Sequence, residues 1–289
     1  MSILFGAESF IHPMNKSVRI VGDVPPDDFG KHLAVVCAAH QATVERIAAA
    51  EWSLHGAVDR YELLRALLPW ARNEGAIVHL SCTERPARAF LFDLDATLTA
   101  CEFLDTLADE LGIGAQTREL TRTAMNGTLD FATSYRTRLQ LLAGTPLDRI
   151  EALIARLPLA QGAEALCEAL HRRALPTAIV TGGYARVGRA VQQRLGIGTL
   201  YATELEERDG RLTGRILGPL LDDAAKVDAL DDFCARNGCE REDCAAVGDG
   251  ANDLRMLAAA GHAVLYSALS DHPSKRITAI DFCERLLNS

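Results

Sequence analysis

Long apolar runs are missing from the 289-residue sequence, and none approaches the about 18 residues that a membrane-spanning helix needs. The first residues, Met1 to Met14, lack a basic segment followed by a sustained apolar stretch, so no secretory signal is expected. Positive charge is also scarce, with 30 Lys and Arg against 39 Asp and Glu and a net charge of −9. We therefore predict no nucleic-acid partner, no membrane partner and a cytoplasmic location.

Closely paired cysteines are absent as well. The eight cysteines are spread too thinly for a disulfide scaffold, so reduced and buried thiols are expected. The one cluster, Cys234, Cys239 and Cys244, has four residues in each gap and lacks the CxxC pair of zinc sites. No GxxxxGKS/T, HExxH or GxSxG motif occurs, and no GxGxxG follows a predicted strand.

The chain is long enough for about two domains, and a polar stretch containing Pro86 marks the expected boundary. Residues 1–86 are predicted to be a small α/β domain with a regulatory or dimerisation role, so a homodimer is possible. Its expected elements are a strand, two helices and a second strand, at Ser17–Val21, Asp28–Trp52, Leu54–Ala71 and Ala76–Leu80. This β-α-α-β order differs from the βαββαβ order of regulatory amino-acid-binding domains.

Residues 87–289 alternate short apolar runs with helical stretches, which predicts an α/β fold with a parallel sheet covered by helices. The expected strands are Ala89–Phe92, Thr177–Val180, Ala245–Val247 and Ala263–Tyr266. The first three end in polar or glycine residues, and ligands bind at the carboxyl ends of such strands. Four helical stretches inserted at about 103–160 predict a cap over this edge, and Asp209-Gly210 predicts a hairpin turn.

Four carboxylates are expected to converge at that edge. Asp93 and Asp95 follow the first strand, and Asp249 and Asp253 follow the third. Without a cation these groups would repel one another strongly. Oxygen ligands beside a phosphate favour Mg²⁺, so we predict a magnesium site.

A site for an anion is expected beside the carboxylates. Thr181, Gly182 and Gly183 can donate hydrogen bonds from a hydroxyl and from backbone N–H groups next to the start of a helix. Lys226, near the start of another helix, adds a fixed positive charge. Each signal is weak alone, and their order along the chain is what makes them specific.

This order of motifs resembles the haloacid dehalogenase superfamily and, within it, the phosphoserine phosphatases, from Ala89 to about Tyr266. The matching segments are DLDAT at 93–97, Thr181-Gly182, Lys226, GDGAND at 248–253, AMNGTLDF at 124–131 and RTR at 136–138. Three positions depart from the family pattern. Ala96 and Thr181 stand where Ser is usual, and residues 267–273 lack the usual Ala-Lys-Pro stretch.

The resemblance implies a HAD-like phosphatase domain that hydrolyses O-phospho-L-serine to L-serine and phosphate, the last step of serine biosynthesis. Asp93 would be the nucleophile that forms an aspartyl-phosphate, and Asp95 the general acid and base. Asp93, the backbone carbonyl of Asp95 and Asp249 would hold Mg²⁺, with Asp253 in a supporting position. Thr181, Gly182 and Lys226 would bind the phosphoryl oxygens.

Substrate recognition would then rest on the cap. Arg138 would grip the substrate carboxylate with paired hydrogen bonds and Glu102 its ammonium group. Met125 and Phe131 would exclude water, while Gly183 and Asn252 would complete the binding site. Two alternatives are a phosphatase or phosphotransferase for another small phosphate ester and a non-catalytic sensor of a phosphorylated ligand.

Overall fold

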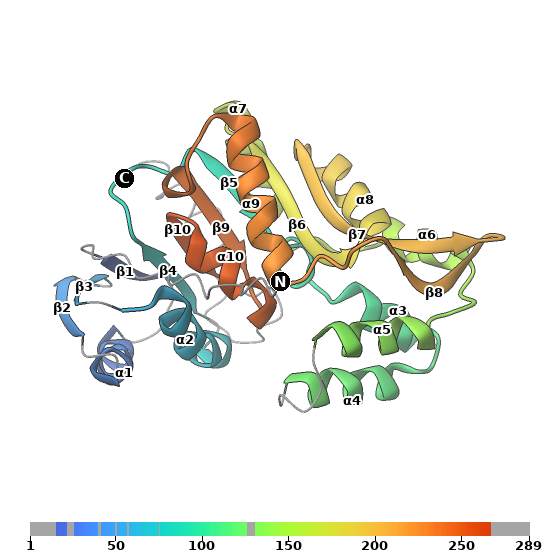
Figure 1. The fold of residues 1–289 in the computed structure, drawn as a ribbon, viewed down its shortest axis with the longest axis horizontal. Coiled ribbons are helices and arrows are strands. Elements are labelled where there is room, and N and C mark those ends of the chain that lie inside the picture. Colours follow the sequence, from blue (N-terminus) through green and yellow to red (C-terminus); the bar gives the residue numbers. More distant parts are fainter. Residues whose placement is uncertain are drawn as a thin grey trace, which may run out of the picture.

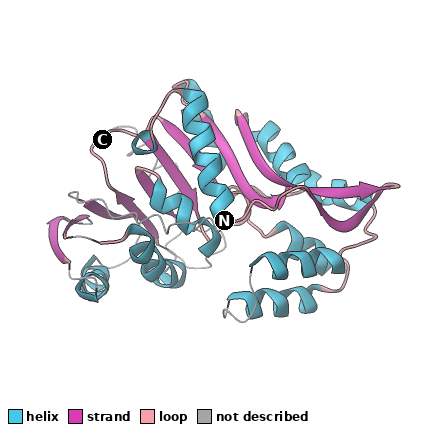
Figure 2. Ribbon diagram, in the orientation of Figure 1, coloured by secondary structure: helices cyan, strands magenta, loops and turns pink. Residues whose placement is uncertain are grey.

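The protein's fold is a ten-stranded mixed sheet with helices on both faces (Figures 1 and 2). The structure is a computed structural model that describes residues 16–21, 26–39, 42–49, 51–56, 58–74, 76–125 and 131–266. The strand order is β2-β3-β1-β4-β10-β9-β5-β6-β7-β8. No helix in these ranges is long and apolar enough to cross a membrane.

The parallel part of the sheet confirms the predicted α/β fold. Its strands are β5 (Ala89–Phe92), β6 (Thr177–Tyr184), β7 (Thr199–Arg208), β9 (Cys244–Gly248) and β10 (His262–Leu265). All neighbouring pairs from β10 to β7 run parallel. The hairpin predicted at Asp209-Gly210 is also present, because β7 pairs antiparallel with β8 (Arg211–Leu217).

Two apolar cores cover the two faces of this sheet, and strand alternation assigns side chains to each. On β5, Ala89 and Leu91 belong to one core, whereas Phe90 and Phe92 belong to the other. Buried residues on both faces explain why the parallel strands are continuous apolar runs in the sequence. Further helices complete the layers: α7 (Ala163–Arg172), α8 (Ala185–Leu195), α9 (Asp223–Asn237) and α10 (Leu254–Ala259).

The N-terminal unit has the order βαββαβ, which corrects the predicted β-α-α-β. Its elements are β1 (Lys16–Val21), α1 (Pro26–Ala39), β2 (Thr43–Ala48), β3 (Glu51–His55), α2 (Arg60–Glu74) and β4 (Ile77–Ser81). The predicted helix Asp28–Trp52 therefore ends at Ala39, and its second half is a strand pair. β1 lies between β3 and β4 and pairs antiparallel with both, as in ferredoxin-like units.

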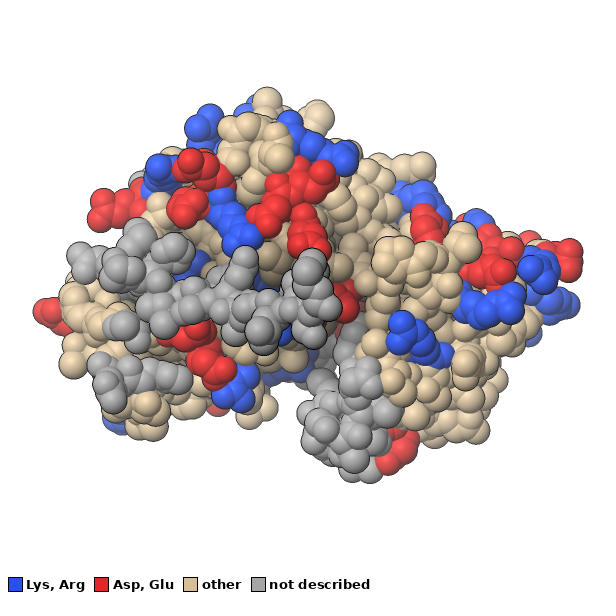
Figure 3. All heavy atoms as spheres, in the orientation of Figure 1, with Lys and Arg blue, Asp and Glu red and all other residues tan. Residues whose placement is uncertain are grey.

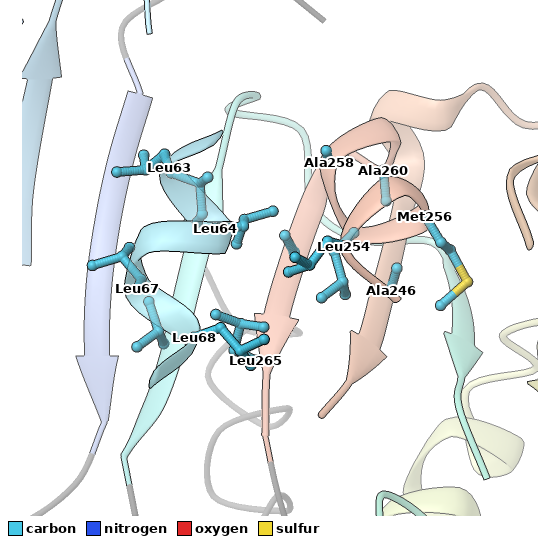
Figure 4. Close-up of a cluster of buried hydrophobic side chains, with 14 of the residues drawn as sticks. Leu63, Leu64, Leu67, Leu68, Ala246, Leu254, Met256, Ala258, Ala260 and Leu265 are labelled. Atoms are coloured by element: carbon cyan, nitrogen blue, oxygen red, sulfur yellow. The ribbon is translucent and has the colours of Figure 1, made fainter. Parts of the chain in front are cut away.

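This unit shares its sheet and one core with the rest of the chain. β4 pairs antiparallel with β10, so hydrogen bonding continues across the predicted boundary. Leu64 of α2 is buried in one cluster with Leu254 and Leu265 (Figure 4). The domain division near Pro86 stays a prediction.

Four helices lie between β5 and α7, where the helical cap is predicted (Figure 1). They are α3 (Phe103–Glu110), α4 (Gly114–Met125), α5 (Phe131–Leu141) and α6 (Leu147–Ala155). On the face drawn in Figure 3, the acidic and basic side chains of the described residues are interspersed.

Candidate active site

Three buried carboxylates meet at the carboxyl ends of two neighbouring strands. Asp93 follows β5, Asp249 follows β9, and Asp253 lies in the short 3-10 turn at 251–253. One oxygen from each lies within 4.8 Å of the other two. The side chains are almost fully buried, because β5 and β9 are central and paired with each other. The fold therefore gathers acids that are separated by about half of the chain.

Lys226 joins two of these carboxylates. It lies in the first turn of α9 and is 0% exposed. Its Nζ donates to Asp93 Oδ1 at 2.6 Å and to Asp253 Oδ1 at 2.5 Å. The helix is fixed at this end because Asp222 is its N-cap and accepts a hydrogen bond from Ala225 N at 3.0 Å.

Charge balance in the cluster is incomplete. Burial and the neighbouring charges of Asp253 and Asp249 raise the pKa of Asp93 well above its ordinary value, although Lys226 opposes this. Burial and Asp253 raise the pKa of Asp249 to about 7. The pKa of Lys226 is raised because the two carboxylates outweigh the effect of burial. The Lys226 ammonium contacts two of the three acids, Asp93 and Asp253, and the donor set fits a hard, oxygen-ligated divalent cation.

Asp95 lies beside this cluster, but its side chain contacts other residues than those of the cluster. Its Oδ1 accepts a hydrogen bond from the backbone N–H of Phe103, the first residue of α3, at 2.9 Å. Its Oδ2 lies 2.7 Å from the position that a Cβ on Gly183 would occupy. Burial, with a smaller contribution from Asp93, raises the pKa of Asp95 to about 7. A proton can therefore be held on, or taken up by, this carboxyl near neutral pH.

The turn predicted to bind an anion is a bulge within β6. The register with β7 shifts between Thr181 and Tyr184, which leaves Gly182 and Gly183 as extra residues. Thr181 Oγ1 accepts a hydrogen bond from Gly183 N at 2.9 Å. The Thr181 hydroxyl proton is therefore oriented away from that N–H. Gly183 approaches the Asp95 carboxyl so closely because it lacks a side chain.

The cap contributes Glu102 and Arg138 to the same region. Glu102 precedes α3, and burial together with the charges of Asp95 and Asp105 raises its pKa to about 8, opposed by Arg138. Arg138 Nη1 lies 3.7 Å from Asp105 Oδ1, and its guanidinium lies 5.8 Å from the Tyr135 ring centroid. These relations place a cation and an acid of the cap within electrostatic reach of Asp95.

The remaining predicted site residues lie in or near the same loops. Asn252 is in the 3-10 turn with Asp253. Met125 ends α4 and Phe131 begins α5, but their side chains are outside the described part of the structure. Residues 126–130, which belong to the matching segment at 124–131, and residues 267–273, where the sequence departs from the family pattern, are also outside it.

One residue of this site, Arg72, was not predicted from the sequence. It lies in the last turn of α2, in the N-terminal unit. Its Nε donates to the backbone oxygen of Asp249 at 3.0 Å, and its Nη2 donates to Asp249 Oδ2 at 3.1 Å. No motif signals this contact, because an arginine near a helix end is ordinarily a solvated residue that complements the helix dipole.

A parallel α/β sheet with a helical insertion and an acidic, lysine-bridged cluster at its strand ends defines a class of enzymes that work on anionic substrates with a divalent cation. The sequence profile of the haloacid dehalogenase-like hydrolases matches residues 90–258. The chain therefore belongs to the haloacid dehalogenase-like hydrolases, as the sequence motifs predicted.

Within this family, the chain is similar to phosphoserine phosphatases. The chain is 35% identical over 188 residues to the phosphoserine phosphatase of Archaeoglobus fulgidus, covering 65% of this chain and 55% of that protein. It is 34% identical over 276 residues to the phosphoserine phosphatase of Streptomyces coelicolor, covering 86% of this chain and 67% of that one. The match thus spans little more than half of the first relative.

The fold is also similar to that of a solved phosphoserine phosphatase structure. That structure is described as a phospho-aspartyl intermediate analogue of phosphoserine phosphatase. It superposes with a TM-score of 0.57 at 36% identity, covering 61% of this chain and 85% of that one.

Proposed function

We propose that this protein is a Mg²⁺-dependent phosphomonoester hydrolase that converts O-phospho-L-serine to L-serine and phosphate. The observation that carries the proposal is the meeting of Asp93, Asp249, Asp253 and Lys226 at one sheet edge in a haloacid dehalogenase-like hydrolase. The names of the relatives support the substrate.

The residues that would hold the metal are Asp93, Asp249 and the backbone carbonyl of Asp95, with Asp253 supporting them through Lys226. Bound Mg²⁺ would neutralise the clustered carboxylates and polarise the phosphoryl group. Thr181, Gly182 and Lys226 would bind the phosphoryl oxygens, because phosphoryl transfer depends mainly on positioning and charge neutralisation.

In the first step, a carboxylate oxygen of Asp93 attacks phosphorus, and the bond from phosphorus to the serine oxygen breaks. Asp95 gives its proton to the leaving alkoxide, and L-serine departs. Burial of Asp95 supports this role, because a pKa of about 7 leaves a substantial fraction of the carboxyl protonated at neutral pH. The hydrogen bond from Phe103 N fixes one oxygen of Asp95.

In the second step, water attacks the phosphorus of the aspartyl-phosphate while Asp95 accepts its proton. The bond from phosphorus to Asp93 breaks, phosphate leaves, and both carboxyl groups return to their starting states. The similar solved phosphoserine phosphatase carries an analogue of a phospho-aspartyl intermediate, which supports this covalent route.

Specificity for an amino-acid ester would come from Arg138 and Glu102, with Met125, Phe131, Gly183 and Asn252 completing the substrate site. Arg138 would form two hydrogen bonds with the substrate carboxylate, and Glu102 would bind its ammonium group. The electrostatic reach of both residues to Asp95 and to each other supports this assignment.

The test compares two substrates that differ in the carboxylate. Arg138→Ala should lower kcat/KM for L-phosphoserine by at least 100-fold, equivalent to about 3 kcal/mol, and change that for p-nitrophenyl phosphate by less than about 5-fold. Arg136→Ala is the matched control, because Arg136 is on the same helix and exposed. Parent protein should lose activity in a chelator and regain it with Mg²⁺.

Three results would contradict parts of the proposal. Equal losses of kcat/KM on both esters in Arg138→Ala would contradict the binding of the substrate carboxylate by Arg138. Equal rates of the parent protein across a panel of esters would indicate a phosphatase of broader specificity. Phosphate release by Asp93→Asn at the parent rate would exclude the covalent mechanism. The homodimer and the cytoplasmic location stay predictions.

A further inference from the structure

Among the described residues of the N-terminal unit, Arg72 contacts the acidic cluster. Arg72 makes a two-pronged contact with Asp249, to its backbone oxygen at 3.0 Å and to its Oδ2 at 3.1 Å. The Asp249 side chain is 8% exposed, and that of Arg72 is 32% exposed. Because the two acceptors belong to one residue, the contact fixes both the loop after β9 and the rotation of the carboxylate.

Helix α2 is held at its other end as well. Arg60, its first residue, is buried and donates from Nη1 to the backbone oxygen of Ala260, just after α10, at 2.6 Å. Between the two arginines, Leu64 of α2 is buried on the side that faces Leu254 of α10 (Figure 4). The segment from Asp249 to Ala260 is therefore braced along its length by one helix of the N-terminal unit.

We propose that Arg72 is a positioning residue for the metal ligand Asp249, so that the N-terminal unit sets the affinity of the site for Mg²⁺. One carboxylate oxygen of Asp249, Oδ2, accepts a hydrogen bond from the guanidinium, and the other oxygen would then be available to the ion. This inference rests on the metal site of the proposed function. Groups that orient a metal ligand from outside the coordination shell typically change metal affinity about 10- to 100-fold.

The experiment is Mg²⁺ titration by calorimetry of the full chain, with no phosphate ester present. Arg72→Ala should raise the dissociation constant for Mg²⁺ about 10-fold or more. Arg72→Lys should restore part of the affinity, because an ammonium can reach one acceptor but lacks the fork. Circular dichroism and thermal melting of the metal-free variants verify that the fold is kept.

Arg65→Ala is the matched control, because Arg65 is on the same helix, is exposed and pairs with Glu62. It should bind Mg²⁺ like the parent. An unchanged or lower dissociation constant in folded Arg72→Ala would overturn the proposal, as would equal values for Arg72→Ala and Arg72→Lys. The titration measures the ion alone, so an incorrect ester assignment would leave its outcome unchanged.

A second cluster carries an independent inference. Cys234 in the last turn of α9, Cys239 just after that helix and Cys244 at the start of β9 bring their sulfur atoms within 4.8 Å of one another. The Sγ of Cys244 lies 3.3 Å from that of Cys234 and 3.8 Å from that of Cys239. The cluster is at the opposite end of β9 from Asp249.

The distance from Cys239 to Cys244, 3.8 Å, equals that between two sulfur ligands of one metal, and the distance from Cys234 to Cys244, 3.3 Å, is 0.5 Å shorter. With a Zn–S bond of about 2.3 Å, three sulfurs of a tetrahedral centre lie about 3.8 Å apart. Cys239 is partly exposed, which gives an ion a route to the buried pair.

We infer that these three cysteines form a site for a thiophilic divalent cation. Binding would form three metal–sulfur bonds and release the thiol protons to solvent, with no change of oxidation state. Mg²⁺ would not compete, because thiolates favour soft ions and Mg²⁺ favours oxygen.

The test is titration with Cd²⁺ in buffer that contains excess Mg²⁺, followed by thiolate-to-metal charge-transfer absorption. One equivalent should bind tightly, and Cys239→Ser should weaken binding at least 10-fold. Cys167→Ala, which removes a buried cysteine from α7, should bind like the parent. Parent-like affinity in Cys239→Ser, or equal loss in Cys167→Ala, would overturn the inference.

Discussion

Lys226 illustrates how a local conflict can mark a functional residue. A cation in the first turn of a helix is disfavoured by the helix dipole, and a fully buried ammonium is costly. Asp93 and Asp253 compensate both effects through hydrogen bonds of 2.6 and 2.5 Å. Such compensation is expected where a charge is kept for chemistry rather than for stability.

Gly183 offers a test of the geometry around Asp95. A Cβ at this position would lie 2.7 Å from Asp95 Oδ2 and 3.0 Å from Thr181 Oγ1. Gly183→Ala should therefore lower kcat about 10- to 100-fold, because displacing a reacting group by about 1 Å costs about this much. Thermal melting should change little.

The matched control is Gly198→Ala. Its added methyl would meet only the backbone oxygen of Thr177, at an ordinary contact distance of 3.5 Å. Parent-like kcat in Gly183→Ala would mean that Asp95 has space to move, contrary to the packing described above.

The acids of the site and Lys226 could be predicted from the sequence, because they occur in the order of a known family motif. The sequence could not predict Arg72, whose partner Asp249 is 177 residues away. Nor could it predict that Ala96, between the two acids of its loop and the threonine that follows, adopts the left-handed conformation with φ of 57°. Alanine has no sequence preference for that region, so only the surrounding contacts hold it there.

Among the elements, the strands at the site were predicted well, as were β1 and β4, whereas β2 and β3 were predicted as helix. The strands β5 and β9 are short apolar runs ending in polar residues, which is a clear signal. By contrast, the alanine-rich segment around β2 and β3 favours helix, and no Gly, Asn or Pro marks its turn. Pairing of β3 with β1 and packing of Trp52 against Phe29, with ring centroids 5.1 Å apart, override that preference.

Helix α2 allows a test of whether the two predicted domains unfold together. Leu64 is fully buried in the core that includes α10, so Leu64→Ala should destabilise the protein by about 2–5 kcal/mol. Val35→Ala is the control, because Val35 is 71% exposed on α1. We expect one cooperative denaturant transition that shifts as a whole. Two transitions, with only one shifted by the substitution, would indicate independent domains.

For the molecule as a whole, the shared sheet explains how a small N-terminal unit can influence chemistry in the larger part. β4 pairs with β10, and β10 pairs with β9, the strand that Asp249 follows. A displacement of the N-terminal unit would therefore affect the acidic cluster through both the sheet and α2. This continuity has no signal in the sequence, because strand pairing over such distances depends on tertiary contacts rather than on local pattern.

The buried acids of the site predict how pH and Mg²⁺ act on stability. Burial raises the pKa of Asp249 and of Asp95 to about 7 and that of Glu102 to about 8. Between about pH 4 and these values the folded state binds protons that the unfolded state has lost, so rising pH should destabilise the metal-free protein.

Thermal melting in a chelator should therefore give a lower Tm at pH 7.5 than at pH 5.5. One unit of pKa shift is about 1.4 kcal/mol, and 1 kcal/mol moves the Tm of a domain of 150–250 residues by about 2–4 °C, so a fall of several degrees is expected. Added Mg²⁺ should raise the Tm more at pH 7.5, because it replaces protons in neutralising the carboxylates. Asp249→Asn removes one of these acids and should show a smaller fall between the two pH values. A Tm that rises from pH 5.5 to pH 7.5 without metal would mean that the acids are ionised at little cost in the folded protein, and the electrostatic reason for a bound cation would then be lost.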